Sequence, residues 1–452
     1  DFSKQRLTNE TLARLVALGR SRDLPGAINR LFTGERVNAT EDRPALHTAL
    51  RGDERVVAGG EDVLAQVQRC RARMRAFSTA VRDGSWKGAT GSPIRHVLSL
   101  GIGGSYLGPR LAVEALAAMA DGPQVRFVAN VDPAAFDDAV AGLAPVDALG
   151  EAALARHMVA ATASAAEAGR FGIPECNVFP FGEWVGGRYS VWSSVGLPIA
   201  IAVGMPAFER FLAGAHAVDL EFRSAPLERN VPFLLAATAL WNRNFLGIPV
   251  HLVLPYAQRL ASLPGYLQQL EMESNGKRVS AAGEALAWTT CPALFGEAGT
   301  LGQHAFYQWL HQGTDEASCD FIVVARPMGG REGDHAALLA NALAQSEALM
   351  TGRATGDPHR DCPGNRPSTT IVLESLEPAS LGALVALYEH KTFALGTLWG
   401  VNPFDQFGVE LGKAIAGRIL PALAGEASDL HPATRHLLDT IGRAARGGTG
   451  RA

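Results

Sequence analysis

The sequence has few cysteines and no arrangement of them that points to a disulfide or metal framework. The five are Cys70, Cys176, Cys291, Cys319 and Cys362, which lie far apart and form neither a CxxC pair nor the Cys/His spacing of a zinc site. Disulfide-rich secreted scaffolds and structural zinc modules are therefore not expected. A reducing compartment fits this cysteine usage.

Long apolar runs and a strong charge of one sign are also missing. The longest apolar runs, VPFLLAATALW and VGLPIAIAV, are too short to span a bilayer, and the first residues, DFSKQRLTNE, are polar rather than signal-like. Lysine and arginine number 41 against 45 acidic residues, and no basic run carries interleaved aromatics. We therefore expect a soluble, cytoplasmic protein that neither crosses a membrane nor binds nucleic acid.

What the chain does contain is an alternation of strand-like and helix-like segments. Short apolar or β-branched runs begin at HVLSL (96–100) and QVRFVAN, and continue later with PVHLVLPY, DFIVVAR and TTIVLESL. Helical patterns separate these runs, which is typical of α/β layers with largely parallel sheets. The runs fall into two groups, and 452 residues exceed what a single core usually supports.

These patterns predict four parts. Residues 1–88 form a helical extension, with a capped helix at TNETLARLVAL and amphipathic spacing in EDVLAQVQRCRARMRAF. Residues 89–210 form a first α/β domain and residues 211–425 a second. Residues 426–452 form a helical tail.

A glycine-rich turn follows the strand-like HVLSL. Gly101, Gly103 and Gly104 allow a tight turn and a close backbone approach, and Ser105 adds a hydroxyl where the next helix begins. Such a turn can present backbone N–H groups to an anion. It lacks the Gly-Lys-Ser/Thr of a P-loop and the third glycine of a dinucleotide fingerprint, so a nucleotide is not favoured. A turn with only a packing role is the alternative.

Several longer blocks carry a family resemblance. They are VGGRYSVWSSVGLPIA, LPGYLQQLEMESNGKRV, GEAGTLGQHAFYQWLHQGT, GNRPST and YEHKTFALGTLWGVNPFDQFGVELGK. Together with GIGGSYLGP and LLANALAQSEALM, these blocks resemble the glucose-6-phosphate isomerase family in order and over most of the chain. The resemblance implies two sugar isomerase (SIS) domains, each a three-layer α/β/α fold with mainly parallel sheets, and helical extensions at both ends. It further implies a homodimer that uses no cofactor and no metal.

By the same resemblance, the protein interconverts glucose 6-phosphate and fructose 6-phosphate through a cis-enediol(ate), and Glu273 is the catalytic base. Pro264 near a helix start and Asn275-Gly276 as a stop place Glu273 in the last turn of a short helix, where the dipole disfavours a carboxylate. Gln269, four residues earlier, matches a substrate-contacting glutamine. Glu271 lies outside the motif's glutamate position, so we expect it to be a solvated surface charge.

The remaining catalytic roles also come from the resemblance. His304 assists ring opening from the partner subunit, and Lys413 acts with it. We place His304 at the start of a helix, where the dipole favours neutral imidazole. Arg188 matches the arginine beside the enediolate, where a permanent cation stabilises developing negative charge. The alternatives are a structural histidine for His304, a solvated helix lysine for Lys413 and a structural ion pair for Arg188. We expect His311 to be a structural histidine.

Gly103, Gly104 and Ser105 match the family's first phosphate loop, but a second one is absent. Relatives carry a Ser-Lys-x-Phe-x-Thr-like run after the strand that follows NVDP, whereas here residues 128–169 pass from one helix-like piece to another. Either the protein has lost a strand, loop and helix, or the 452-residue sequence omits a stretch of the natural chain. We favour omission, because losing a strand would expose core and edge backbone.

Two rival functions follow from these observations. One is an isomerase of another sugar phosphate on the same scaffold. The other is a sugar-phosphate-binding protein that has lost catalysis, which the absent loop favours and the joint presence of Glu273, His304 and Lys413 opposes.

Overall fold

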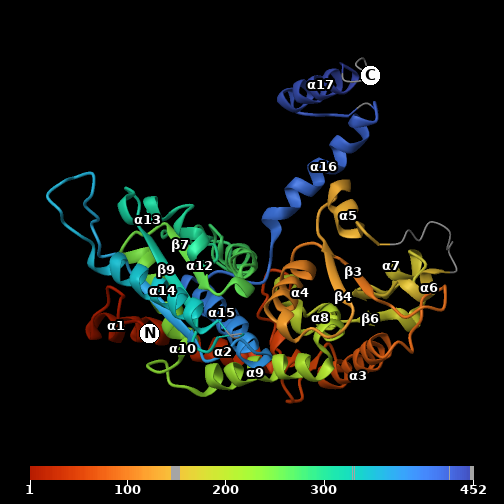
Figure 1. Cartoon of the computed structure of the whole chain (residues 1–452), viewed down its shortest axis with the longest axis horizontal. Helices are drawn as coiled ribbons and strands as arrows, with labels where there is room; N and C mark the ends of the chain where they lie inside the picture. The colour runs from red at the N-terminus through yellow and green to blue at the C-terminus, as the bar shows by residue number, and fades with distance from the viewer. Residues whose placement is uncertain (144–152, 328, 330, 427, 448–452) are drawn as a thin grey trace. The chain divides into compact units, whose positions relative to one another are not determined.

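The computed structural model describes residues 1–143, 153–327, 329, 331–426 and 428–447 (Figure 1). These residues belong to two compact units, residues 1–404 and residues 405–452. Every strand of the described chain and all of the site described below, except Lys413, lie in the first unit. None of the helices in the described ranges is both long and apolar enough to cross a membrane.

The first unit begins with the expected helices. They are α1 (Asn9–Ser21), α2 (Leu24–Thr33) and α3 (Val63–Arg82). The Thr8 hydroxyl caps α1 by accepting from the Thr11 N–H, as the TNETLARLVAL pattern predicts. A two-stranded antiparallel ribbon, β1 (Val57–Ala58) and β2 (Glu61–Asp62), precedes α3.

The second half of the first unit contains a four-stranded parallel sheet. Its strands are β7 (Val250–Tyr256), β8 (Ala293–Phe295), β9 (Ala317–Val324) and β10 (Ser368–Leu373), in the order β10-β9-β7-β8. Three of the four were expected from their apolar runs, whereas the three-residue β8 was not.

Helices cover both faces of this sheet. They are α11 (Leu263–Leu267), α12 (Gly299–Gln303), α13 (Tyr307–Gln312), α14 (Glu332–Thr351) and α15 (Pro378–Trp399), and α9 (Met205–Ser224) and α10 (Val231–Leu240) pack against α15. Helix α8 (Leu197–Val203) instead contacts α3 and α9. Alternate strand residues enter two separate cores: Phe321 packs with α13 and α14, whereas Ile322 packs with α15. This half is therefore a three-layer α/β/α structure, and the predicted fold class of mainly parallel α/β is confirmed.

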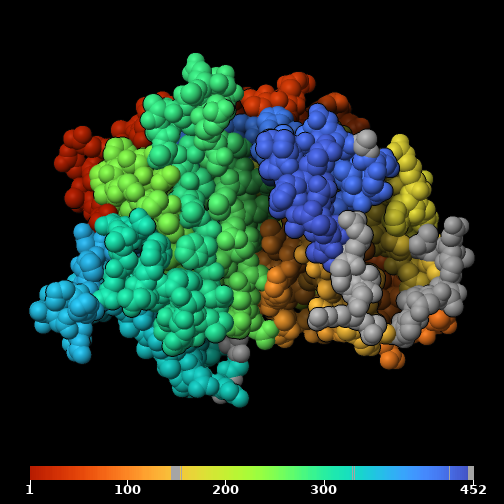
Figure 2. Space-filling model, turned by 90° about the horizontal axis from the view of Figure 1, so that it is seen from above, coloured from red at the N-terminus to blue at the C-terminus, as the bar shows by residue number. Residues whose placement is uncertain are grey.

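The first half contains shorter pieces of parallel sheet. Strand β3 (His96–Leu100) pairs with β4 (Gln124–Val128), and β5 (Ala160–Thr162) pairs with β6 (Val178–Pro180). In the described chain these remain two separate pairs. Their helices are α4 (Gly104–Ala115), α5 (Pro133–Val140), α6 (Leu154–His157) and α7 (Ala165–Arg170). In Figure 2 the orange and yellow first half lies beside the green and cyan second half.

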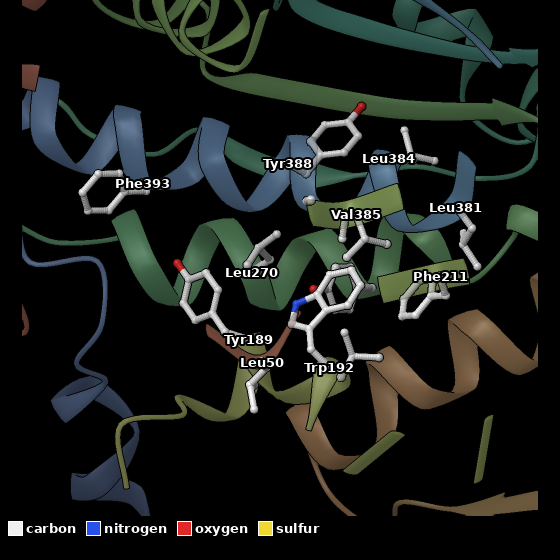
Figure 3. Close-up of a cluster of buried hydrophobic side chains, with 14 of the residues drawn as sticks. Leu50, Tyr189, Trp192, Phe211, Leu270, Leu381, Leu384, Val385, Tyr388 and Phe393 are labelled. Carbon is white, nitrogen blue, oxygen red and sulfur yellow. The ribbon is translucent and has the colours of Figure 1, made fainter. Parts of the chain in front are cut away.

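Helix α15 crosses the middle of the core. Figure 3 shows its side chains on both sides of the helix, with Tyr388 pointing away from Trp192 and Phe211. The Tyr388 hydroxyl donates to Asp320 Oδ2 in β9 at 2.9 Å, so this side of α15 faces the sheet. Because α15 contacts the sheet, α9 and α10, it is the element that joins the layers.

The second unit contains α16 (Glu410–Leu423) and α17 (Pro432–Gly447). The tail helix expected within 426–452 corresponds to α17. The four domains proposed from the sequence remain a prediction.

Candidate active site

The glycine turn lies at the carboxyl end of β3 and leads into α4. Gly103 has a φ of 59°, a left-handed conformation that favours glycine. Gly104 is the first residue of α4, and a Cβ there would clash with the carbonyl oxygen of Gly187. Both glycines are thus required by geometry. The turn places the N-terminus of α4, with the exposed Ser105, beside the loop that carries Arg188.

Gln269 reaches the same turn from the second half of the unit. A Cβ at Gly103 would lie 2.9 Å from its Nε2. The Gln269 Oε1 is buried and has no hydrogen-bond partner within the described residues. The sequence-predicted Gly103, Gly104 and Gln269 therefore come together in space, and the Gln269 amide oxygen is free to bind a ligand.

Arg188 is buried beside Glu273. Its side chain is 2% exposed, and its Nη1 lies 3.3 Å from Glu273 Oε2. Nε donates to Ser274 Oγ at 2.7 Å and Nη2 donates to the Pro403 carbonyl at 2.7 Å, which fixes the guanidinium plane. The sequence left two roles for Arg188, a structural ion pair or a cation of the active site. The two roles coincide, because the ion-pair partner of Arg188 is Glu273.

Glu273 lies in the last turn of a helical segment, as expected, but the segment is not an ordinary α-helix. Pro264 stands at the start of α11, and a π-helical turn, η9 (Gln268–Glu273), follows it. The Gly276 N–H donates to the Met272 carbonyl and closes the end. π-Turns are frequent at functional sites. The Glu273 side chain is 20% exposed, so it is shielded but reachable.

The prediction for Glu271 is wrong. This residue is buried, and its Oε2 accepts from Lys391 Nζ of α15 at 2.9 Å. The π-turn directs the Glu271 side chain into the core and the Glu273 side chain toward Arg188. The lysine of YEHKTFALG, set in an otherwise mostly apolar helix, was the one available sign that a buried carboxylate would be needed nearby.

His304 lies at the end of a helix rather than at the start of one. It is the C-cap of α12, its N–H donates to the Leu301 carbonyl, and α13 begins only at Tyr307. The prediction that a helix N-terminus favours the neutral imidazole of His304 is therefore wrong. The side chain is exposed and makes no hydrogen bond or ion pair within the described ranges. Its catalytic role remains a prediction.

Lys413 lies on α16 in the second unit, and its side chain is exposed. Its role in ring opening remains a prediction. Among the described residues, no three His, Cys, Asp or Glu side chains converge in a way that could hold a metal ion.

A buried ionic cluster, which sequence analysis missed, lies in the same core. Arg51 donates to Asp219 through Nε (2.8 Å) and Nη2 (2.6 Å), and to Glu389 through Nη1 (2.5 Å). His390 Nε2 lies 2.7 Å from Asp219 Oδ1, and Trp192 Nε1 donates to Glu389 Oε1. Burial raises the pKa of Glu389 to about 7, although Arg51 opposes the shift. The pKa of Asp219 is lowered, because Arg51, His216 and His390 together outweigh its burial.

Comparison with known proteins identifies the family of the chain. The phosphoglucose isomerase family model matches residues 1–149 and 144–438. The chain belongs to the phosphoglucose isomerase family. The resemblance found in the sequence blocks is thus confirmed.

Individual relatives agree over nearly the whole chain. A glucose-6-phosphate isomerase of Roseiflexus sp. is 46% identical over 95% of this chain and 87% of its own length. One from Brucella ovis is 44% identical over 94% of this chain and 87% of its own. The crystal structure of a glucose-6-phosphate isomerase from Chlamydia trachomatis superimposes with a TM-score of 0.87, at 30% identity, over 98% of this chain and 91% of that one.

The same comparison locates a gap. The Roseiflexus alignment has 471 positions, and 95% of 452 residues is about 430, so roughly 40 aligned positions have no residue in this chain. The family model matches in two pieces that meet at residues 144–149, which lie among those outside the description. This break falls within residues 128–169, where the sequence lacks the expected strand and second phosphate loop.

Proposed function

We propose that this chain is an aldose–ketose isomerase that interconverts glucose 6-phosphate and fructose 6-phosphate through a cis-enediol(ate). The observation that carries the proposal is the Glu273–Arg188 pair, set beside the glycine turn and Gln269 in a member of the phosphoglucose isomerase family. A carboxylate and a buried cation at one point are what proton transfer beside a carbonyl requires.

In the proposed mechanism Glu273 removes the proton from C2 of the open-chain aldose and returns it to C1, while the hydroxyl proton of O2 moves to O1. Arg188 Nη1 lies 3.3 Å from Glu273 Oε2, so the cation is in place before the reaction. When Glu273 takes the proton, its negative charge passes to the enediolate oxygen. The guanidinium, already fixed by Ser274 and Pro403, then stabilises that charge without rearranging.

Binding and ring opening involve the other predicted residues. The phosphate is held at the N-terminus of α4, where the backbone N–H of Gly104, the exposed Ser105 hydroxyl and the helix dipole favour an anion. The Gln269 amide oxygen can accept from a sugar hydroxyl. His304 and Lys413 open the ring, and His304 serves the site of a partner subunit in a cytoplasmic homodimer. Its exposed side chain is compatible with that role.

A coupled assay tests the reaction. Glucose 6-phosphate should be converted to fructose 6-phosphate in the presence of a chelator and without nucleotide. Activity lost in chelator and restored by a divalent metal would overturn the cofactor-free mechanism. Mannose and glucosamine 6-phosphates, assayed in parallel, distinguish an isomerase of another sugar phosphate.

Subunit complementation tests the shared site. Homodimers of His304→Ala and of Glu273→Gln should both be poorly active. Co-expression should restore activity, because one site of each heterodimer then combines an intact Glu273 with an intact His304. About half of the wild-type activity per heterodimer is expected when the sites are independent. No recovery, with the heterodimer verified by native mass spectrometry, would assign both residues to one chain.

A second candidate is a sugar-phosphate-binding protein without catalysis, and the gap of roughly 40 aligned positions favours it. The intact mass of the protein isolated from its natural source separates the two explanations of the gap. A mass equal to that of the 452-residue chain would mean that the segment is lost. Binding of fructose 6-phosphate without turnover would then support this second candidate.

A further inference from the structure

Lys391 and Glu271 form a buried ion pair directly behind the proposed base. The two side chains are 1% and 2% exposed, and Nζ lies 2.9 Å from Glu271 Oε2. Glu271 and Glu273 are two residues apart in η9, one facing the core and the other facing Arg188. Anything that moves the Glu271 carboxylate therefore moves the backbone that carries Glu273.

The pair is one of several contacts that hold the 271–275 segment. Asn275 Nδ2 donates to the carbonyl of Thr392, the next residue of α15, at 3.0 Å. Ser274 is bound from the other side by Arg188 Nε. Figure 3 shows the helical segment that carries Leu270 alongside α15. Glu273 thus lies between two anchors on α15, a long, buried and rigid element.

The pair is not an ordinary stabilising contact. Glu271 Oε1 is buried and has no hydrogen-bond partner within the described residues, so half of the carboxylate is unsatisfied. Although burial opposes its charge, Glu271 and Asp320 raise the pKa of Lys391, so the ammonium remains charged. A buried ion pair of this kind is weak evidence for stability, and apolar residues of similar size often serve as well. The position of this ion pair next to Glu273 suggests a role other than stability.

We propose that Lys391 is a positioning residue: its ion pair with Glu271 holds the π-turn so that the Glu273 carboxylate meets the substrate proton. This inference rests on the proposed function. Lys391 touches neither substrate nor reacting atoms. A displacement of about 1 Å at a catalytic group can cost about 100-fold in rate.

The test replaces the pair by apolar residues in the double variant Lys391→Met, Glu271→Leu, which leaves no uncompensated buried charge. Binding sites are counted by calorimetry with glucitol 6-phosphate, a reduced sugar phosphate that lacks the carbonyl and cannot isomerise. Turnover is then expressed per binding site. We expect an affinity within about twofold of wild type and a turnover per site lowered by about 10- to 100-fold. Partial unfolding would lower the number of binding sites and the total turnover in proportion, and would leave the turnover per site unchanged.

The matched control is Tyr388→Phe, one turn earlier on α15. It removes the buried hydrogen bond to Asp320 but keeps the ring over which Lys391 Nζ lies at 5.5 Å. Its turnover per site should equal that of wild type. If the double variant does not fold, Glu271→Gln, which keeps the shape and loses the charge, is assayed in the same way and should also lose turnover.

A per-site turnover within threefold of wild type in the folded variant would overturn the positioning role while leaving the proposed function intact. An equal loss in Tyr388→Phe would overturn it as well, because any disturbance of α15 would then suffice. A wild-type protein that binds sugar phosphate but does not isomerise it would overturn both.

Discussion

The two halves of the first unit differ in how completely their sheets are built. In the second half four parallel strands form one sheet, and all eight residues of β9 are buried. In the first half the described strands form two separate pairs, and no side chain of β3 or β4 is fully buried. Several large apolar side chains of this half are exposed, among them Ile102, Val131 and Phe171.

The two pieces of the family match meet in this first half, at residues 144–149, and roughly 40 positions of the Roseiflexus alignment have no residue in this chain. Exposed apolar side chains are what we expect where a sheet lacks a strand. The site draws on both halves: Glu273 and the Lys391–Glu271 pair lie in the second half, whereas Arg188 and the glycine turn after the weakly covered β3 lie in the first. Chemistry and substrate binding should therefore respond differently to substitution, and four measurements test this comparison.

The largest effect is expected for Glu273→Gln. The amide has nearly the shape of the carboxylate but cannot accept a proton, so kcat should fall by at least about 1,000-fold. Binding of glucitol 6-phosphate, measured by calorimetry, should change little, because the glycine turn is untouched. Near-wild-type turnover would exclude Glu273 as the base.

The next comparison is one of stability between the two sheets. Ile322 in β9 is fully buried, and Ile322→Ala should cost about 3 kcal/mol of unfolding free energy. Leu98 in β3 is only half-buried, and Leu98→Ala should cost about 1 kcal/mol. Urea unfolding of both variants measures the difference. Equal costs would show that the first sheet is as well packed in solution as the second.

A pH-dependent effect is expected from the ionic cluster that joins Arg51 and Trp192 to α15. Between its ordinary pKa of 4.5 and its folded pKa of about 7, Glu389 holds a proton that the unfolded chain releases. Its contribution to stability therefore falls as the pH rises through this window. Glu389→Gln cannot ionise, so its stability relative to wild type should increase by up to about 3 kcal/mol from pH 4.5 to 7 and then level off. The stability of both proteins is measured against pH by thermal or urea unfolding. Parallel curves for wild type and Glu389→Gln would contradict the raised pKa of Glu389.

The smallest effect is expected at the contact between the glycine turn and η5 (Gly187–Trp192), the 3₁₀ turn that carries Arg188. Gly104→Ala places a methyl group against the Gly187 carbonyl and should push the α4 N-terminus away from the Arg188 loop. We expect KM for the sugar phosphate to rise about tenfold, worth about 1.4 kcal/mol of binding, with a smaller change in kcat. Gly169→Ala, where nothing lies within 4 Å of the new methyl group, is the control and should behave as wild type. A fall in kcat alone would contradict a binding role.

Much of the fold could be predicted because local patterns carry it. The runs at 96–100, 249–256 and 369–376 are long and apolar enough to specify strands, and β3 matches its predicted range. The strands β5, β6 and β8 have three residues each, too few for any periodicity. Only pairing with a neighbouring strand makes them part of a sheet.

The sequence by itself determined the family, the glycine turn and the helix whose last turn carries Glu273, because each is recorded in residue types at fixed spacing. The tertiary structure alone decided which carboxylate of LEMES is buried: a π-turn rotates Glu271 toward Lys391, 120 residues away along the chain. It also made Arg188 the partner of Glu273 and brought Gln269 to Gly103. Burial and ion pairing depend on what packs against a side chain, and contacts between distant segments leave no mark in local sequence.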